Sequence, residues 1–136
     1  MFGDALVRSL LQSPAHRLVS GSTDLVRFTG RRSGRTITTP TQYAEVGDEL
    51  VILAARPDTK QWWRNFEEER PVDVLVRGTW RPMLGRAVCG RDDPDATAPL
   101  LAAYLERFPA AARALPGDDL EQHLDGTVVV RCRPAT

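Results

Sequence analysis

Apolar residues recur along this chain with two spacings, one typical of helices and one typical of strands. An N-terminal helical segment is predicted over residues 1–20, where Asp4 can cap a helix whose apolar face consists of Leu6, Val7, Leu10 and Leu11. Pro14 ends or kinks that helix. We expect its apolar face to pack against the rest of the chain.

Six later segments have the β-branched composition of strands: residues 22–30, 36–46, 49–55, 72–78, 80–90 and 126–134. Gly47-Asp48 joins the second and third of these segments as a hairpin, and Gly78-Thr79 joins the fourth and fifth. Pro40 lacks an N–H group for a strand ladder, so the second segment is expected at a sheet edge or at a bulge.

Helical patterns separate and follow these strands. Residues 59–70 form a predicted inserted helix that Asp58 and Gln61 can cap, with Trp62 and Phe66 four residues apart on one face. Asp93-Pro94 begins another helix, and prolines 109 and 116 divide the helical region that follows. The apolar face of this second helix consists of Leu101, Leu105 and Phe108, with Tyr104 beside it.

This order of elements predicts a mainly β fold of the α+β class. We expect six mostly antiparallel strands in a small barrel, with an N-terminal helix, one inserted helix and C-terminal helices around it. The 136 residues contain no repeat, linker or low-complexity tract, so a single domain over residues 1–136 is predicted.

Composition narrows the function classes. The formal net charge is zero, so no overall field attracts nucleic acid or an anionic membrane. No run approaches the roughly 20 apolar residues that cross a bilayer, and no secretory signal is visible, so membrane association is not expected and the cytoplasm is the predicted location. Cys89 and Cys132 are isolated and are expected to be reduced.

Several common site types do not fit the chain. The only histidines, His16 and His123, lie near no cysteine or carboxylate cluster with metal-ligand spacing, so no metal site is expected. No nucleophile elbow is present. The sequence GRRSGR is not followed by the Lys-Ser/Thr pair of a nucleotide-binding P-loop.

The stretch TGRRSGRTITTP, residues 29–40, is the strongest candidate for binding chemistry. Gly30 and Gly34 allow close backbone approach, Arg31 and Arg32 supply charge, and Ser33 supplies a hydroxyl. This combination suits a phosphate group, yet an ordinary hairpin turn has the same spacing. From spacing alone, both interpretations stay open.

Several pieces in order resemble one known family, the deazaflavin (F420)-dependent nitroreductases and quinone reductases of the flavin/deazaflavin oxidoreductase superfamily. The family pattern is a Thr-Gly-Arg-[Lys/Arg]-[Ser/Thr]-Gly loop, a proline, a hydrophobic hairpin, a lysine and a Trp-[Tyr/Trp]-x-Asn-[Leu/Phe] helix. In this chain the pattern falls on Thr29, Gly30, Arg31, Arg32, Ser33, Gly34, Pro40, Lys60, Trp62, Trp63, Asn65 and Phe66. The resemblance implies a split β-barrel fold.

The resemblance also implies site residues for coenzyme F420. The loop residues Gly30 to Gly34 would hold its phosphate, mainly through Arg31, Arg32 and Ser33. Three groups would complete the cofactor site: Thr39, Pro40 and Thr41 along a groove, Ala54, Ala55 and Arg56 beside the ring, and Lys60 and Trp62 from the helix N-terminus.

The chain departs from the family at three places. Ile37 stands where an arginine is usual, three residues before the proline. The connection before the tryptophans is short, so Arg56 or Lys60 would replace a missing cation. The late tyrosines of nitroreductase members have no clear counterpart.

The implied reaction is hydride transfer from the reduced deazaflavin to a small conjugated acceptor such as a quinone, an enone or a nitro compound. A proton would come from water or from a hydroxyl group, with Tyr43 and Tyr104 the only tyrosines. No residue is identified as a required acid or base, so the catalytic residues are not predicted.

Two alternatives stay open: an FMN-binding split-barrel protein, and a cofactor-free binding or scaffold protein. Either a monomer or a homodimer is compatible with the sequence.

Overall fold

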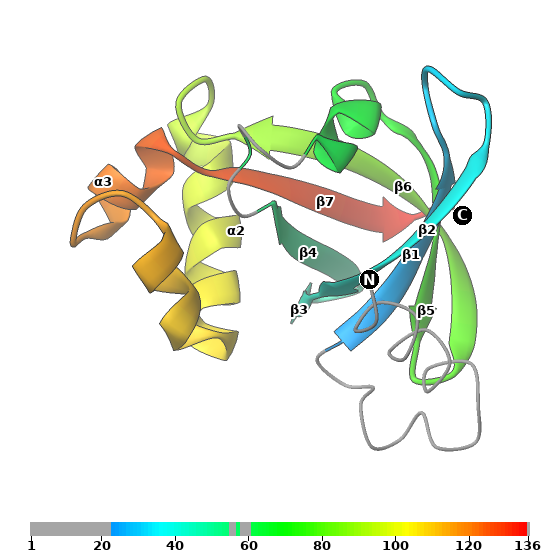
Figure 1. The fold of residues 1–136 in the computed structure, drawn as a ribbon. Coiled ribbons are helices and arrows are strands. Elements are labelled where there is room, and N and C mark those ends of the chain that lie inside the picture. The colour runs from blue at the N-terminus through cyan, green and yellow to red at the C-terminus, as the bar shows by residue number, and fades with distance from the viewer. Residues whose placement is uncertain (1–22, 55–56, 58–60, 136) are drawn as a thin grey trace.

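The computed structural model describes residues 23–54, 57 and 61–135, and its centre is one antiparallel sheet (Figure 1). The strands are β1 (Thr23–Thr29), β2 (Thr36–Gln42), β3 (Ala44–Val46), β4 (Glu49–Ala54), β5 (Arg70–Val76), β6 (Thr79–Cys89) and β7 (Val128–Pro134). Their order across the sheet is β2-β1-β5-β6-β7-β4-β3, and every pair is antiparallel. The predicted split β-barrel of the α+β class is confirmed.

The strand count is seven among the described residues, so the prediction of six strands was wrong. The predicted strand 36–46 is divided at Tyr43, because β2 pairs with β1 while β3 pairs with β4. β2 and β3 are the two edges of the sheet and only one residue separates them, so the sheet must curl until its edges approach each other. Pro40 lies in the edge strand β2, as the sequence predicts.

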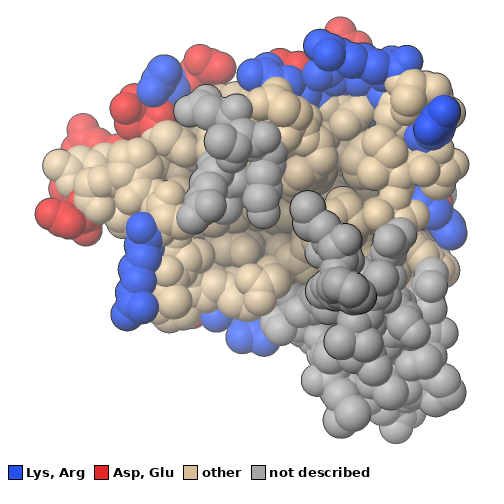
Figure 2. All heavy atoms as spheres, viewed as in Figure 1, with Lys and Arg blue, Asp and Glu red and all other residues tan. Residues whose placement is uncertain are grey.

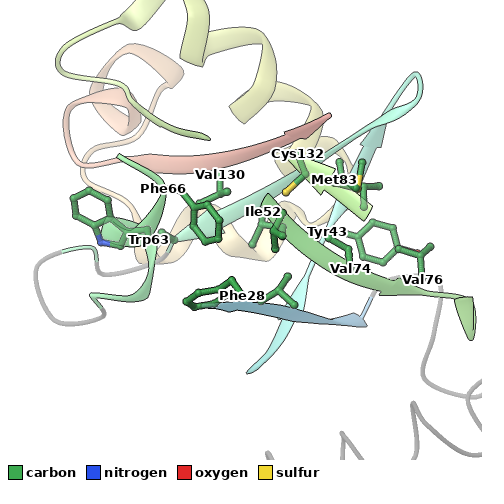
Figure 3. Close-up of a cluster of buried hydrophobic side chains, with 14 of the residues drawn as sticks. Phe28, Tyr43, Ile52, Trp63, Phe66, Val74, Val76, Met83, Val130 and Cys132 are labelled. Atoms are coloured by element: carbon green, nitrogen blue, oxygen red, sulfur yellow. The ribbon is translucent and has the colours of Figure 1, made fainter. Parts of the chain in front are cut away.

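Side chains from alternate positions of the strands fill the barrel interior (Figure 3). Phe28, Ile52, Val74 and Val130 are all 5% exposed or less and belong to this main core. Phe66 packs edge-on against Phe28 with ring centres 5.1 Å apart, which closes the interior at the end of β1. This end of the barrel is therefore lined by aromatic rings.

Three helical segments follow β6 and lie to one side of the barrel (Figure 1): α2 (Pro94–Arg107), the 3-10 helix η3 (Pro109–Ala114) and α3 (Leu120–Asp125). The Asp93 carboxylate accepts a hydrogen bond from the N–H of Ala96, which confirms the predicted helix start. Leu100 and Tyr104 pack on the outer face of the sheet, while Leu101 packs against Leu124 of α3.

The predicted inserted helix over residues 59–70 was wrong in length and type. The structure has a five-residue 3-10 helix, η2 (Trp62–Phe66), and β5 begins as early as Arg70. Trp63 and Phe66 both pack in the barrel core, and only residues 67–69 separate η2 from β5, which is too few for a further α-helical turn. Asp58 of the proposed cap and the predicted N-terminal helix of residues 1–20 lie outside the described residues.

In the described part of the chain, no helix is long and apolar enough to cross a membrane.

Candidate functional site

The loop between β1 and β2 is held in shape by its own hydrogen bonds. Gly30 N–H donates to Arg35 O at 2.8 Å, and Gly34 N–H donates to Gly30 O at 2.9 Å. Ser33 Oγ accepts a bond from Arg35 N–H at 3.1 Å. Gly34 has a φ of 69°, a backbone conformation that glycine adopts without strain. The loop is therefore a defined turn that projects beyond the end of β1.

Asn65 joins this loop to η2. Its Oδ1 accepts a hydrogen bond from the Arg31 N–H at 2.7 Å, and its Nδ2 donates to the Trp62 carbonyl at 2.8 Å. The side chain is 9% exposed, so these two bonds form largely away from water and fix the orientation of the amide. Asn65 thus fixes two segments against each other that are 34 positions apart in sequence.

A hollow of about 320 Å³ lies where the loop meets η2. It is lined by Gly30, Arg31, Arg32, Ser33, Ile37, Gln61, Trp62 and Asn65. One wall is apolar, formed by Ile37 and by the half-buried Trp62, whose ring centre is 6.2 Å from that of Phe66. Figure 2 shows basic side chains gathered at the upper edge of the view, the edge at which the β1–β2 loop and η2 lie in Figure 1.

The donors of the loop fit a phosphate group. Among the described residues, the N–H groups of Arg32 and Ser33 have no hydrogen-bond partner, whereas those of Gly30, Arg31, Gly34 and Arg35 are all bonded. The guanidinium groups of Arg31 and Arg32 are exposed and form no ion pair within the described part of the chain. Free amides and forked cations beside each other are the donor set that phosphate oxygens require.

Gly30 makes the close approach of the loop to β2 possible. A Cβ atom on this residue would lie 2.8 Å from Ser33 Oγ and 2.9 Å from Ile37 Cδ1. Both neighbours line the hollow, so a side chain at position 30 would push the loop hydroxyl and the apolar wall apart. Glycine at this position therefore keeps the loop donors close to the hollow.

A profile of the F420H(2)-dependent quinone reductases matches residues 5–104, which is more than half of the chain. The chain belongs to this family. No curated protein sequence matches it significantly. The match spans the loop, the hollow and η2, and it confirms the resemblance seen in the sequence motifs.

Solved structures agree with the fold of this quinone reductase family member. A protein solved as a domain-swapped dimer superposes with a TM-score of 0.63 at 15% identity, covering 95% of each chain. An F420-H2 dependent reductase, FDR-A, superposes with a TM-score of 0.61 at 17% identity, covering 83% of this chain and 95% of its own. A putative pyridoxamine 5'-phosphate oxidase from Listeria innocua has a TM-score of 0.55 at 12% identity, with 96% and 94% coverage.

The other predicted cofactor residues of this family member are distributed more widely. Thr39, Pro40 and Thr41 lie along β2 but are not among the residues that line the hollow. Ala54, at the end of β4, is 1% exposed and packs in the barrel core. The predicted positions Ala55, Arg56 and Lys60 lie outside the described residues.

Neither candidate tyrosine proton donor faces the hollow. Tyr43 is 1% exposed inside the barrel, and Tyr104 is 4% exposed on α2 against the outer face of the sheet. Burial raises the pKa of both hydroxyls, that of Tyr104 to about 12. In the described part of the chain, no tyrosine lines the hollow.

Sequence reasoning gave no binding role to three residues that line the hollow, namely Ile37, Gln61 and Asn65. Asn65 was visible as part of the Trp-Trp-x-Asn-Phe motif, but its contact with Arg31 depends on the tertiary fold. Ile37 was noted only as a departure from the family pattern.

The described residues contain no group of three or more His, Cys, Asp or Glu side chains that could hold a metal ion.

Proposed function

We propose that this chain is an F420-dependent oxidoreductase that transfers a hydride between reduced deazaflavin and a small conjugated acceptor. A quinone, an enone or a nitro compound has the flat, electrophilic structure that such a reaction needs. The single observation that carries the proposal is the hollow at which the phosphate-type loop meets the Trp62 side chain. Family membership supports F420 as the cofactor.

In this proposal the chain supplies binding and position, and the deazaflavin supplies the hydride chemistry. Arg31 and Arg32 bind phosphate oxygens through their guanidinium groups, and the N–H groups of Arg32 and Ser33 complete the anion site. Asn65 keeps the loop at a fixed distance from η2. Trp62 and Ile37 form the apolar side of the hollow, against which a flat ring can pack.

The other residues of the family motif complete the proposed site, some of them outside the described part of the chain. Ala55, Arg56 and Lys60 would lie beside the ring and the phosphate, as the family motif implies, together with Thr39, Pro40, Thr41 and Ala54. No protein side chain is assigned as acid or base, and water supplies the proton.

We further propose a cytoplasmic protein that acts as a monomer or a homodimer. A domain-swapped dimer among the structural neighbours supports the second state.

Ligand titration tests the proposal. F420 and FMN are titrated separately, with fluorescence detection, into the wild-type protein and an Arg31→Ala/Arg32→Ala variant. The control is Arg107→Ala/Arg113→Ala, which removes two exposed arginines from α2 and η3 and changes the net charge equally. Charge-assisted hydrogen bonds contribute about 1.5–3 kcal/mol each, so the loop variant should bind F420 at least about tenfold more weakly.

The control variant should bind F420 as the wild type does. Equal losses in both double variants would show that overall charge, and not the loop, attracts the cofactor. Binding of FMN without F420 would place the protein with flavin-dependent enzymes instead. If neither cofactor binds, the redox proposal is wrong and a cofactor-free binding role replaces it.

A further inference from the structure

Two polar atoms inside the barrel have no hydrogen-bond partner in the described part of the chain: Asp24 Oδ2 and Tyr43 Oη. Asp24 is 0% exposed and Tyr43 is 1% exposed, so solvent at the surface cannot satisfy either atom. Buried polar groups in folded proteins are nearly always hydrogen-bonded to protein or to ordered water. The two atoms therefore require a partner inside the barrel.

Asp24 belongs to the inward-facing row of β1. Val26 and Phe28, two and four residues further along the strand, are in the barrel core. Asp24 is paired in register with Thr41 of β2, and the Thr41 hydroxyl donates a hydrogen bond to Asp24 Oδ1. One carboxyl oxygen is thus satisfied within the barrel, and the other is not.

Tyr43 reaches the same end of the interior. It follows Thr41 by two positions, at the point where the chain passes from β2 to β3. Figure 3 shows the Tyr43 ring beside Val76, the last residue of β5. Leu25 pairs with Leu75, and one further step of this antiparallel register brings Asp24 next to Val76. The two unsatisfied atoms therefore share one end of the barrel.

Among the described residues, no charged side chain forms an ion pair that would compensate an ionised Asp24. Burial raises the pKa of Tyr43, the charges of Arg77 and Arg81 lower it, and that of Glu45 raises it. Besides burial, the charge of Asp24 also raises the pKa of two other groups, Tyr104 of α2 and Cys132 of β7, and both are uncharged when protonated. Burial raises the pKa of Asp24 to about 7, against the lowering effects of the Thr41 hydrogen bond and of the Asp24 backbone N–H.

We propose that Asp24, Thr41 and Tyr43 form a second polar site inside the barrel, which binds one water molecule and one proton. Thr41 donates to Asp24 Oδ1, the proton resides on Oδ2, and the Oδ2–H group donates to the water. The water in turn bonds to Tyr43 Oη, so each buried polar atom has a partner.

This site lies at the other end of β1 from the hollow at the β1–β2 loop, although Thr41 also belongs to the proposed cofactor groove. Asp24 lies at the start of β1 and Gly30 lies just beyond its end, six residues away, which is about 20 Å along an extended strand. Neither Asp24 nor Tyr43 lines the hollow at the β1–β2 loop. Protonation of the interior site is therefore measured on the protein without added cofactor.

Two measurements test the proposal. Carbon-13 NMR follows the Asp24 carboxyl of the folded wild-type protein as the pH rises. High-resolution crystal structures compare the wild type with Tyr43→Phe and with the control Tyr104→Phe, which removes the hydroxyl of a buried tyrosine on α2. We expect the Asp24 carboxyl to stay protonated to near-neutral pH, and a water peak between Oδ2 and Tyr43 Oη. That peak should persist in Tyr104→Phe and disappear in Tyr43→Phe.

Three results would overturn the proposal. Asp24 could titrate in the ordinary carboxylate range, which would mean that the barrel holds a charge there. The crystals could show no density between the two atoms. After soaking with rubidium chloride, an anomalous peak at the site would identify a bound cation instead of water. Because the titration uses the wild-type protein, the test stands even if a variant does not fold.

Discussion

Replacement of the buried Asp24 by asparagine should stabilise the protein at neutral and alkaline pH. Asparagine has the same shape, its Oδ1 can accept the hydrogen bond from Thr41, and it carries no charge at any pH. Aspartate must either keep its proton in the barrel or ionise there without an ion-pair partner among the described residues. The stability difference between the two proteins should therefore depend on pH.

The sign and size follow from the pKa of Asp24, which rises from 3.8 to about 7 on folding. Below 3.8 both folded and unfolded states hold the proton, and the carboxyl contributes no pH dependence. Between these values only the folded state holds it, so wild-type stability falls by about 1.4 kcal/mol per pH unit. Above pH 7 the loss is complete at about 4 kcal/mol. This is a large fraction of the free energy of unfolding of a typical domain, about 5–15 kcal/mol.

The assay is urea unfolding, followed by tryptophan fluorescence, of wild type and Asp24→Asn between pH 4 and 8.5. The difference in the free energy of unfolding should be small at pH 4 and should reach about 2–4 kcal/mol at pH 8. Asp73→Asn is the control, since it removes an Asp of the same sheet whose exposed ion pair with Arg27 should contribute less than about 1 kcal/mol. A difference that stays constant across this pH range would refute the reasoning.

Three further variants test other contacts. Asn65→Asp should weaken F420 binding about tenfold or more, since a carboxylate cannot donate to the Trp62 carbonyl and adds a negative charge beside the loop; titration at fixed salt measures this. Gly30→Ala should also weaken F420 binding, with little change in the circular dichroism spectrum, because its Cβ would displace Ser33 Oγ at 2.8 Å. Gly90→Ala should lower stability by about 2 kcal/mol or more in urea unfolding, because its Cβ would lie 2.1 Å from a backbone carbonyl oxygen of α3; a neutral result would contradict this packing.

Local sequence signals were reliable where one short segment decides the structure. The Gly47-Asp48 pair predicts the turn between β3 and β4, because glycine reaches the positive φ of 63° that this turn uses. Asp93 predicts the start of α2, because a carboxylate there caps free N–H groups whatever else surrounds the helix. These features depend on residues only a few positions apart.

Sequence reasoning was wrong where distant segments compete for the same residues. The run 36–46 has uniform strand propensity, and nothing within it indicates that β2 and β3 pair with different neighbours. The segment around Trp62 has a helical pattern, yet the barrel end accepts only a short 3-10 turn before β5 begins. In both cases the pairing of the sheet overrides local propensity.

The sequence by itself determined the family, the antiparallel barrel and the presence of a turn between β1 and β2, because motifs and alternation are properties of neighbouring residues. Only the tertiary structure decided that Asn65 bonds to Arg31 and that Ile37 and Trp62 line one hollow. It also decided that Asp24 is buried, although aspartate in a sequence suggests a surface position. The physical reason is closure of the barrel, which brings residues far apart in the chain together and removes water from between them.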